Sequence, residues 1–174
     1  LRARPMAGDV AFGNEVLAAL APFVWRREVN PGLAEEMHQL VARARTELAV
    51  DVERDLKLGR GGIREVEFFA QSLQLVWGGR EPLVRSTNTL DALRRLRARG
   101  LVTDREGREM ADAYLTLRRL EHRVQFATGL QTHRLPEDDG LLTRIARSVG
   151  FATSHELLRD LDKVRRRVVP RFAS

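Results

Sequence analysis

Apolar residues recur at offsets of three, four and seven positions along most of this chain, and capping residues separate one such stretch from the next. This spacing matches the α-helix, in which residues three and four positions apart share one face. Alternation typical of a strand covers four residues, Asp55–Leu58. We therefore predict an all-α fold, an antiparallel bundle of about six or seven helices with no substantial sheet.

Capping residues and glycines place the predicted helices. Asn30 and Pro31 open a helix that the apolar spacing extends to about Arg54. Asn14 begins a shorter helix that Pro22 interrupts or ends. The other predicted starts are Gly61-Gly62, Asn88, Thr103, Asp139 and Thr153, and the other predicted ends are Gly78-Gly79, Gly100, Gly129, Gly150 and Pro170.

The length of 174 residues predicts one domain, because domains average roughly 150 residues. Within residues 1–174 we expect a connector and first helices over 1–54, a glycine-basic motif over 55–67 and the main bundle over 62–170. The first residue is Leu1 and not methionine, so we expect the chain to be a fragment of a larger protein.

Almost all basic residues are arginine, 28 against 2 lysines, and the net charge is +6. Arginine binds carboxylate and phosphate through its planar fork, which allows an anion-binding surface. Acidic residues are interspersed with the arginines, which favours solvated helix faces instead. Aromatic residues make up 6% of the chain, which argues against a nucleic-acid partner.

Several classes of site have no counterpart in the sequence. The absence of cysteine excludes disulfides and thiolate zinc sites and fits the cytoplasm. The four histidines lack metal-ligand spacing, so no metal site is expected. No nucleophile motif is present, so no catalytic residue is assigned. The longest uncharged run, 68–79, is too short for a spanning helix of ~20 residues, so no membrane partner is expected.

The segment 55–67 is the strongest candidate for chemistry. It combines three glycines with three basic residues around the start of a predicted helix: Gly59, Gly61, Gly62, Lys57, Arg60 and Arg64. A helix start offers unpaired backbone N–H groups and a positive dipole end, which together can bind phosphate. The alternative is a tight connection that needs glycine for its backbone angles, because the Lys-Ser/Thr of a P-loop is missing.

Two glutamates follow in the same segment. Residues two apart on a helix do not face each other, so Glu65 and Glu67 cannot share a metal within it. Glu65 lies near the helix start, where it stabilises the dipole, a structural role. Glu67 points elsewhere and could reach a partner domain, so we count it among the candidate site residues.

The segment Asp55–Gln71 resembles the signature of the glutamine synthetase adenylyltransferase/adenylyl-removing enzymes, and its core is similar to that of the PII uridylyltransferases. Other blocks agree in order: Ala3–Asp9, Pro22–Arg27, Gly78–Arg80, Thr89-Leu90, Ala113-Tyr114 with Leu117–His122, and Gln131–Pro136. The motif and the last block resemble the N-terminal, adenylyl-removing half more than the adenylating half.

The resemblance implies the helical portion that follows a polymerase-β-like nucleotidyltransferase unit. In that family one unit transfers AMP from ATP to a tyrosine of glutamine synthetase, and the other removes it by phosphorolysis to give ADP. The parent enzyme would use Mg²⁺ with ATP or ADP, and this fragment would require neither. The family's metal-binding acidic pair lies in a Gly-Ser…Asp-x-Asp pattern that this chain lacks, so whether the chain alone is an enzyme stays open.

The resemblance also implies partners and roles. Glutamine synthetase, a PII-type signal protein and the rest of the parent chain would be the partners. Lys57, Arg60 and Arg64 would neutralise phosphate, the three glycines would permit backbone approach, and Glu67 would orient a cation or substrate. A regulatory docking module for glutamine synthetase or a PII-type protein is the alternative. The basic run Arg94–Arg99 suggests a third interpretation, a nucleic-acid-binding domain.

Overall fold

The computed structural model describes residues 1–30, 32–49 and 51–172, and these residues form seven α-helices and one 3-10 turn. They are α1 (Val10–Val24), α2 (Leu33–Leu48), α3 (Ile63–Trp77), η1 (Pro82–Val84), α4 (Thr89–Ala98), α5 (Asp104–Thr128), α6 (Asp139–Ser148) and α7 (Ser154–Phe172). The described ranges contain no strand, and one isolated bridge joins Asp55 to Arg134. The all-α prediction is confirmed. None of the described helices combines the length and apolar character that crossing a bilayer requires.

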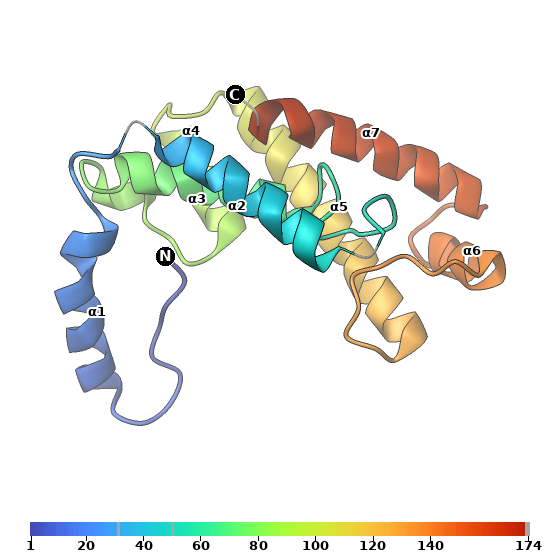
Figure 1. The fold of residues 1–174 in the computed structure, drawn as a ribbon, viewed down its shortest axis with the longest axis horizontal. Helices are drawn as coiled ribbons and strands as arrows, with labels where there is room; N and C mark the ends of the chain where they lie inside the picture. Colours follow the sequence, from blue (N-terminus) through green and yellow to red (C-terminus); the bar gives the residue numbers. More distant parts are fainter. Residues whose placement is uncertain (31, 50, 173–174) are drawn as a thin grey trace.

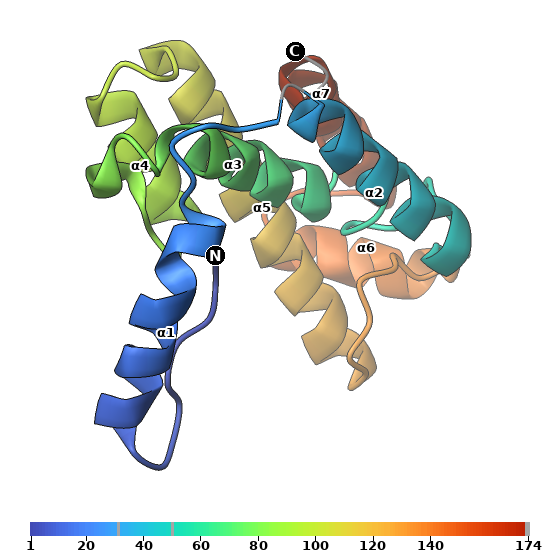
Figure 2. The same ribbon diagram turned by 60° about the vertical axis from the view of Figure 1, so that its left-hand side comes forward.

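Helix α3 is the centre of the bundle and packs against α2, α4, α5 and α7 (Figures 1 and 2). Helices α5 and α7 run antiparallel. Nη1 of Arg171, near the end of α7, accordingly lies 3.3 Å from Oε1 of Glu106, near the start of α5. Helix α1 projects from the remainder, and none of its described residues is buried.

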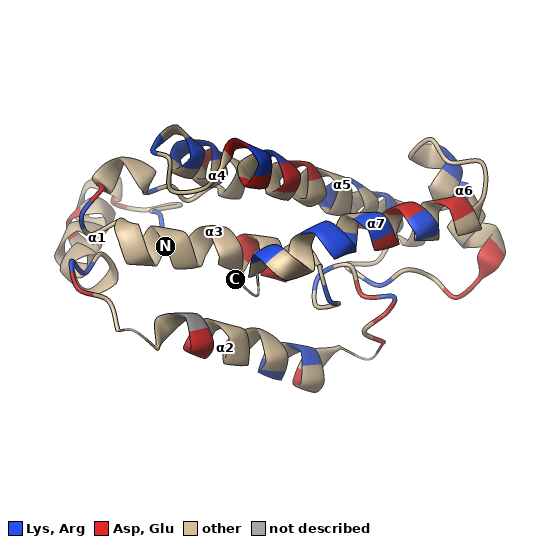
Figure 3. Cartoon of the chain, turned by 90° about the horizontal axis from the view of Figure 1, so that it is seen from above, with Lys and Arg blue, Asp and Glu red and all other residues tan. Residues whose placement is uncertain are grey.

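The main core lies between α3, α5, α6 and α7, where the apolar stripes predicted for these helices meet. Its largest fully buried members are Leu56, Ile63, Val66, Leu93, Met110, Leu117, Val124, Leu135 and Ile145. A smaller cluster forms beneath η1 from Val84, Leu96 and Val102. Charged residues of both signs alternate along the outside of α7 (Figure 3), as expected for a solvated face.

Most predicted caps are confirmed. Thr103 and Glu106 form a capping box at the start of α5, and Gly129 ends that helix in the left-handed conformation at φ 68°. The carboxylate of Asp138, rather than that of Asp139, accepts a hydrogen bond from Leu141 N at 2.6 Å and caps α6. Helix α7 continues two residues past Pro170, which falls in its last turn.

The prediction for the first helix is wrong at its start. Helix α1 begins after Asp9, whose Oδ1 accepts a hydrogen bond from Phe12 N at 3.0 Å, and Asn14 lies inside the helix. Both residue types cap helices. Here the carboxylate of Asp9, five residues before Asn14, caps the helix. Pro22 lies near the end of the helix, which closes at Val24.

The prediction for the second helix is wrong at both ends. Helix α2 has Gly32 as its N-cap, and Asn30 accepts a hydrogen bond from Gly32 N at 3.0 Å outside the helix. Pro31 lies outside the described residues. The helix ends at Leu48, well before Arg54, because Oδ1 of Asp51 accepts hydrogen bonds from the backbone of residues 53 and 54 and folds that stretch into turns.

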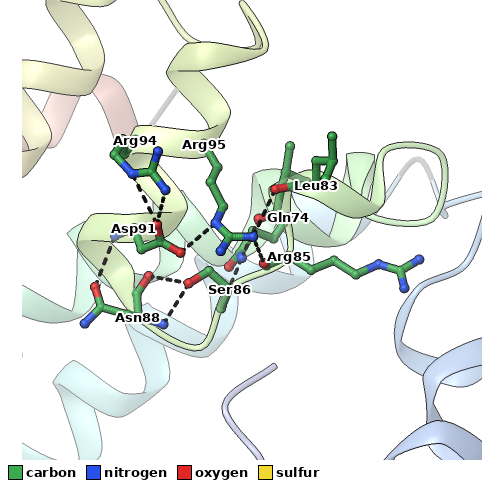
Figure 4. Close-up of polar contacts among 9 residues, drawn as sticks. Gln74, Leu83, Arg85, Ser86, Asn88, Asp91, Arg94 and Arg95 are labelled. Carbon is green, nitrogen blue, oxygen red and sulfur yellow. Dashed lines mark hydrogen bonds and ion pairs between the residues drawn. The ribbon is translucent and has the colours of Figure 1, made fainter.

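Gln74 of α3 holds the segment that carries η1. Its side chain is 2% exposed, and Nε2 donates hydrogen bonds to the carbonyl oxygens of Val84 at 2.9 Å and Ser86 at 3.0 Å (Figure 4). Arg95 of α4 supports the same segment by donating to the carbonyl of Arg85 at 3.0 Å, and Asp91 holds Arg95 in place at 2.6 Å.

We expect Gln74→Leu to lower the free energy of unfolding by roughly 1–3 kcal/mol, because it leaves two inward-facing carbonyl groups without donors. Gln71→Leu on the same helix is the matched control, since its side chain makes no hydrogen bond with a described residue, and its effect should stay within about 0.5 kcal/mol. Urea denaturation of both variants measures the difference, and equal losses would contradict this role of Gln74.

Candidate functional site

The glycine-basic motif begins with a buried aspartate that shapes the turn. Oδ1 of Asp55 accepts hydrogen bonds from Lys57 N at 2.8 Å and Leu58 N at 2.6 Å. Its Oδ2 lies 3.4 Å from Nε2 of His133, and the next residue, Leu56, donates its N–H to the carbonyl of His133 at 2.8 Å. The segment 131–136 therefore lies alongside the motif. Two blocks that are far apart in the sequence, 55–71 and 131–136, are thus neighbours in the structure.

The three glycines of the motif pack tightly against the chain itself. A Cβ on Gly61, whose φ is +66°, would lie 2.6 Å from Cα of Arg165 in α7. A Cβ on Gly59 would lie 2.2 Å from the carbonyl oxygen of Asp55, and one on Gly62 would lie 2.7 Å from that of Gly59. Glycine is needed here because the loop folds onto itself and onto α7 without room for side chains.

Backbone N–H groups at the start of α3 already have acceptors within the chain. Gly61 donates to Oε2 of Glu65 at 3.0 Å, Ile63 donates to Leu56 O at 3.0 Å and Arg64 donates to Lys57 O at 3.0 Å. An anion at this helix start would have to displace those acceptors. That the glycines let a nucleotide approach the backbone stays a prediction. The groups of the motif that are open to a ligand are its side chains.

The three basic side chains of the motif make neither an ion pair nor a hydrogen bond with any residue that the structure describes. Arg60 is exposed and lines a groove of about 700 Å³ beside α7. The guanidinium of Arg64 lies 5.5 Å from the ring centroid of Phe68, and its buried Nε has no acceptor among the described residues. Lys57 is half-buried. These three side chains therefore lack an ion-paired acid among the described residues, although the charge of Arg60 acts on the buried Glu65.

Glu65 joins α3 to α2. It is buried, pairs with Arg45 and accepts the N–H of Gly61, while Arg45 also donates to the carbonyl of Leu58 at 2.9 Å. Burial raises the pKa of Glu65 above its ordinary value, although the Gly61 hydrogen bond and the Arg45 charge oppose that rise. These contacts give Glu65 the structural role expected of it.

Glu67 faces a different part of the fold from the basic side chains of the motif. Its buried Oε1 lies 3.2 Å from Arg2 in the N-terminal segment and 3.5 Å from Arg118 in α5, and Tyr114 OH donates to it at 3.4 Å. Arg2 also donates to Oγ1 of Thr89 at 2.8 Å. The structure thus separates Glu67 from Lys57, Arg60 and Arg64, with which the sequence grouped it.

A second buried carboxylate joins this cluster. Nη1 of Arg118 donates to Oε2 of Glu121 at 2.7 Å, and Nε of Arg118 donates to Tyr114 OH at 3.2 Å. Burial opposes the charge on Arg118, but these hydrogen bonds outweigh it and raise its pKa. Charged residues on a helix usually lie on a solvated face, but Glu121 is buried. Glu121 lies four residues after Leu117 and three before Val124, so the apolar spacing could have placed it inward.

Distant blocks of the sequence meet around α3. Gly79 allows the backbone of Arg26 to pass, since a Cβ there would lie 2.0 Å from the Arg26 carbonyl oxygen. Arg80 donates to the carbonyl of Arg27 at 3.0 Å, and the guanidinium carbon of Arg85 lies 5.0 Å from the ring centroid of Trp25.

Within the residues that the structure describes, no group of three or more histidines, aspartates or glutamates could hold a metal ion.

Comparison with known proteins gives consistent matches. The family described as GlnD PII-uridylyltransferase matches residues 32–173. Proteins named bifunctional glutamine synthetase adenylyltransferase/adenylyl-removing enzyme are similar to this chain. The one from Rhodopseudomonas palustris (strain TIE-1) is 42% identical over 92% of the chain, and the one from Caulobacter vibrioides is 46% identical over 80%. The chain spans 17% and 14% of the lengths of these relatives.

We expect Gly61→Ala to lower the free energy of unfolding by roughly 2–4 kcal/mol, because a Cβ is disfavoured at positive φ and would also press on the backbone of α7. Gly129→Ala is the control, since its φ is +68° but open space surrounds it, and it should lose only about 1–2 kcal/mol. Denaturant unfolding measures both. Equal losses would show that the close approach to α7 contributes nothing.

Proposed function

Because the chain belongs to the GlnD PII-uridylyltransferase family and is homologous to the bifunctional glutamine synthetase adenylyltransferase/adenylyl-removing enzymes, we propose that it forms a helical portion of such an enzyme. That enzyme would adenylylate and deadenylylate glutamine synthetase in the cytoplasm. This chain would supply part of the phosphate environment beside a nucleotidyltransferase unit, with greater similarity to the adenylyl-removing half.

The side chains of Lys57, Arg60 and Arg64, which form no ion pair with a described residue, support this role most strongly. Nearby arginines satisfy their charge within the chain: Arg45 pairs with Glu65, and Arg165 donates to the carbonyls of Glu53 and Asp55 at 2.7 Å each. Cations without a partner beside a tightly built loop are suited to an anionic ligand, because positioned charges stabilise phosphates during transfer.

The proposed roles divide along α3. Lys57, Arg60 and Arg64 neutralise phosphate, and the glycines hold the loop that presents them. Glu67 orients cations, namely Arg2 and Arg118, which it contacts at 3.2 and 3.5 Å. Bound ATP or ADP would supply the phosphates, and Mg²⁺ would neutralise their charge. The described residues offer no metal cluster, so no step with Mg²⁺ is assigned to this chain.

A regulatory docking module is the second candidate, in which the chain binds glutamine synthetase or a PII-type signal protein. The exposed apolar surface of α1 favours it. Phe12 and Phe23 lie eleven residues apart on one side of this helix, and both are largely exposed. Exposed apolar patches of this kind mark interaction sites.

We expect Lys57→Ala and Arg64→Ala each to lower the deadenylylation rate of the full-length enzyme by more than tenfold, about 1.4 kcal/mol. The reason is the loss of a positive charge that faces phosphate. Arg147→Ala in α6 is a matched control, because Arg147 is exposed and unpaired among the described residues. Phosphorolysis of adenylylated glutamine synthetase gives the rate. Wild-type rates for both variants would make the motif purely structural.

Calorimetric titration of the chain separates the two candidates. A phosphate environment predicts binding of ATP, ADP or inorganic phosphate that Lys57→Ala weakens, because the ligand then loses a cation. A docking module predicts binding of glutamine synthetase with no response to these small ligands. If the chain binds neither the small phosphate ligands nor glutamine synthetase, both functions are ruled out for the isolated chain.

A further inference from the structure

The second half of α5 presents a cationic face with an apolar side chain at each end. Leu115, Arg119, His122 and Phe126 follow at offsets of four, three and four, so they lie on one side of the helix. Together with two neighbouring arginines they line a surface hollow of about 450 Å³. We call this surface the 115–126 face; its residues are Leu115, Arg118, Arg119, His122, Arg123 and Phe126.

The apolar ends of the 115–126 face are open to solvent. Leu115 is 53% exposed and Phe126 is 87% exposed. The opposite side of the same helical stretch is well packed, since Leu117, Leu120 and Val124 are buried in the main core. The exposure of Phe126 therefore does not come from a loosely packed helix, and an aromatic ring left in water at a built hollow is typical of a contact surface.

Two cations of the 115–126 face, Arg119 and Arg123, lack acidic partners within the described chain, whereas Arg118 pairs with Glu67 and Glu121. Arg119, His122 and Arg123 form neither an ion pair nor a hydrogen bond through their side chains with described residues. The nearest acid along the helix, Glu121, is buried and holds Arg118. The acid Asp160 of α7 lines a separate, smaller hollow with Arg119.

The first half of α5 shows the opposite arrangement. There Arg105 pairs with Glu109 at 2.8 Å, and Glu106 pairs with Arg171 at 3.3 Å. The helix dipole favours cations in the last turn, but the last turn of α5 contains no basic residue, so the dipole does not account for the charges of Arg119 and Arg123. Nor does it account for two exposed apolar side chains that bracket the charges on one stripe.

We propose that the 115–126 face docks an acidic amphipathic helix of another protein. Carboxylates of that helix face Arg119, His122 and Arg123, and apolar residues pack on Leu115 and Phe126. The two apolar ends are eleven residues apart, roughly 16 Å along α5, which a helix of about three turns can match. Apolar anchors provide the buried contact, and opposite charges provide orientation and fast association. This surface is separate from the glycine-basic motif and does not depend on its role.

Fluorescence anisotropy with the 174-residue chain tests this docking. The probe is a labelled helical peptide of about 15 residues, with leucines eleven positions apart and glutamates between them on the same side. We expect the double variant R119E/R123E to weaken binding by at least about tenfold, and Phe126→Ser to weaken it several-fold. The matched control R144E/R147E on α6, whose arginines are also exposed and unpaired among described residues, should bind like the unaltered chain.

A charge swap makes the test specific. A peptide with lysines in place of the glutamates should bind R119E/R123E better than it binds the unaltered chain. Circular dichroism melting curves verify that each variant folds. Equal binding of a scrambled peptide of the same composition, an equal loss in the α6 control or no binding at all would overturn the proposal. Binding to phosphatidylserine vesicles or duplex DNA through this face, without peptide binding, would also overturn it.

Discussion

The close contact between the 52–62 loop and Arg165 of α7 determines the arrangement of the rest. Gly61 brings the loop backbone against Arg165, and the guanidinium donates to the carbonyls of Glu53 and Asp55 at 2.7 Å each. Burial of this guanidinium lowers its pKa. A side chain at Gly61 would hold α7 away from the loop, and α3 would lose one of the helices that it packs against. The position at which α3 begins, and the direction of its first turn, therefore depend on this contact.

The same contact changes which groups can meet a ligand. The loop is closed by hydrogen bonds between its own amides and carbonyls, so the backbone offers less to an anion than the glycines suggest. The groups that stay available are the side chains of Lys57, Arg60 and Arg64, which form no ion pair with a described residue. Glu67 faces away toward Arg2 and Arg118. A contiguous stretch of sequence thus serves two places in the fold, because Glu65 of α3 pairs with Arg45 of α2 whereas Glu67 pairs with Arg118 of α5.

Local patterns allowed most of the helices to be predicted. The caps of α4 and α5 are confirmed, since a capping side chain bonds within three residues and needs no tertiary partner. The end of α2 was missed because Asp51 competes with the helix for the same backbone N–H groups. The burial of Glu121 does not follow from its residue type, because the ion pair with Arg118 is what makes that burial possible.

Periodicity, capping and short motifs are local properties, so the helical class, most helix boundaries, the family and the glycine-basic motif could all be identified from the sequence. The contact of Gly61 with α7, the separation of Glu67 from the neighbouring cations and the choice of which arginines form ion pairs follow from the packing of the helices. Pairing is a matter of distance between side chains on different helices. Those distances are set by how the helices pack together, which no local pattern in the sequence expresses.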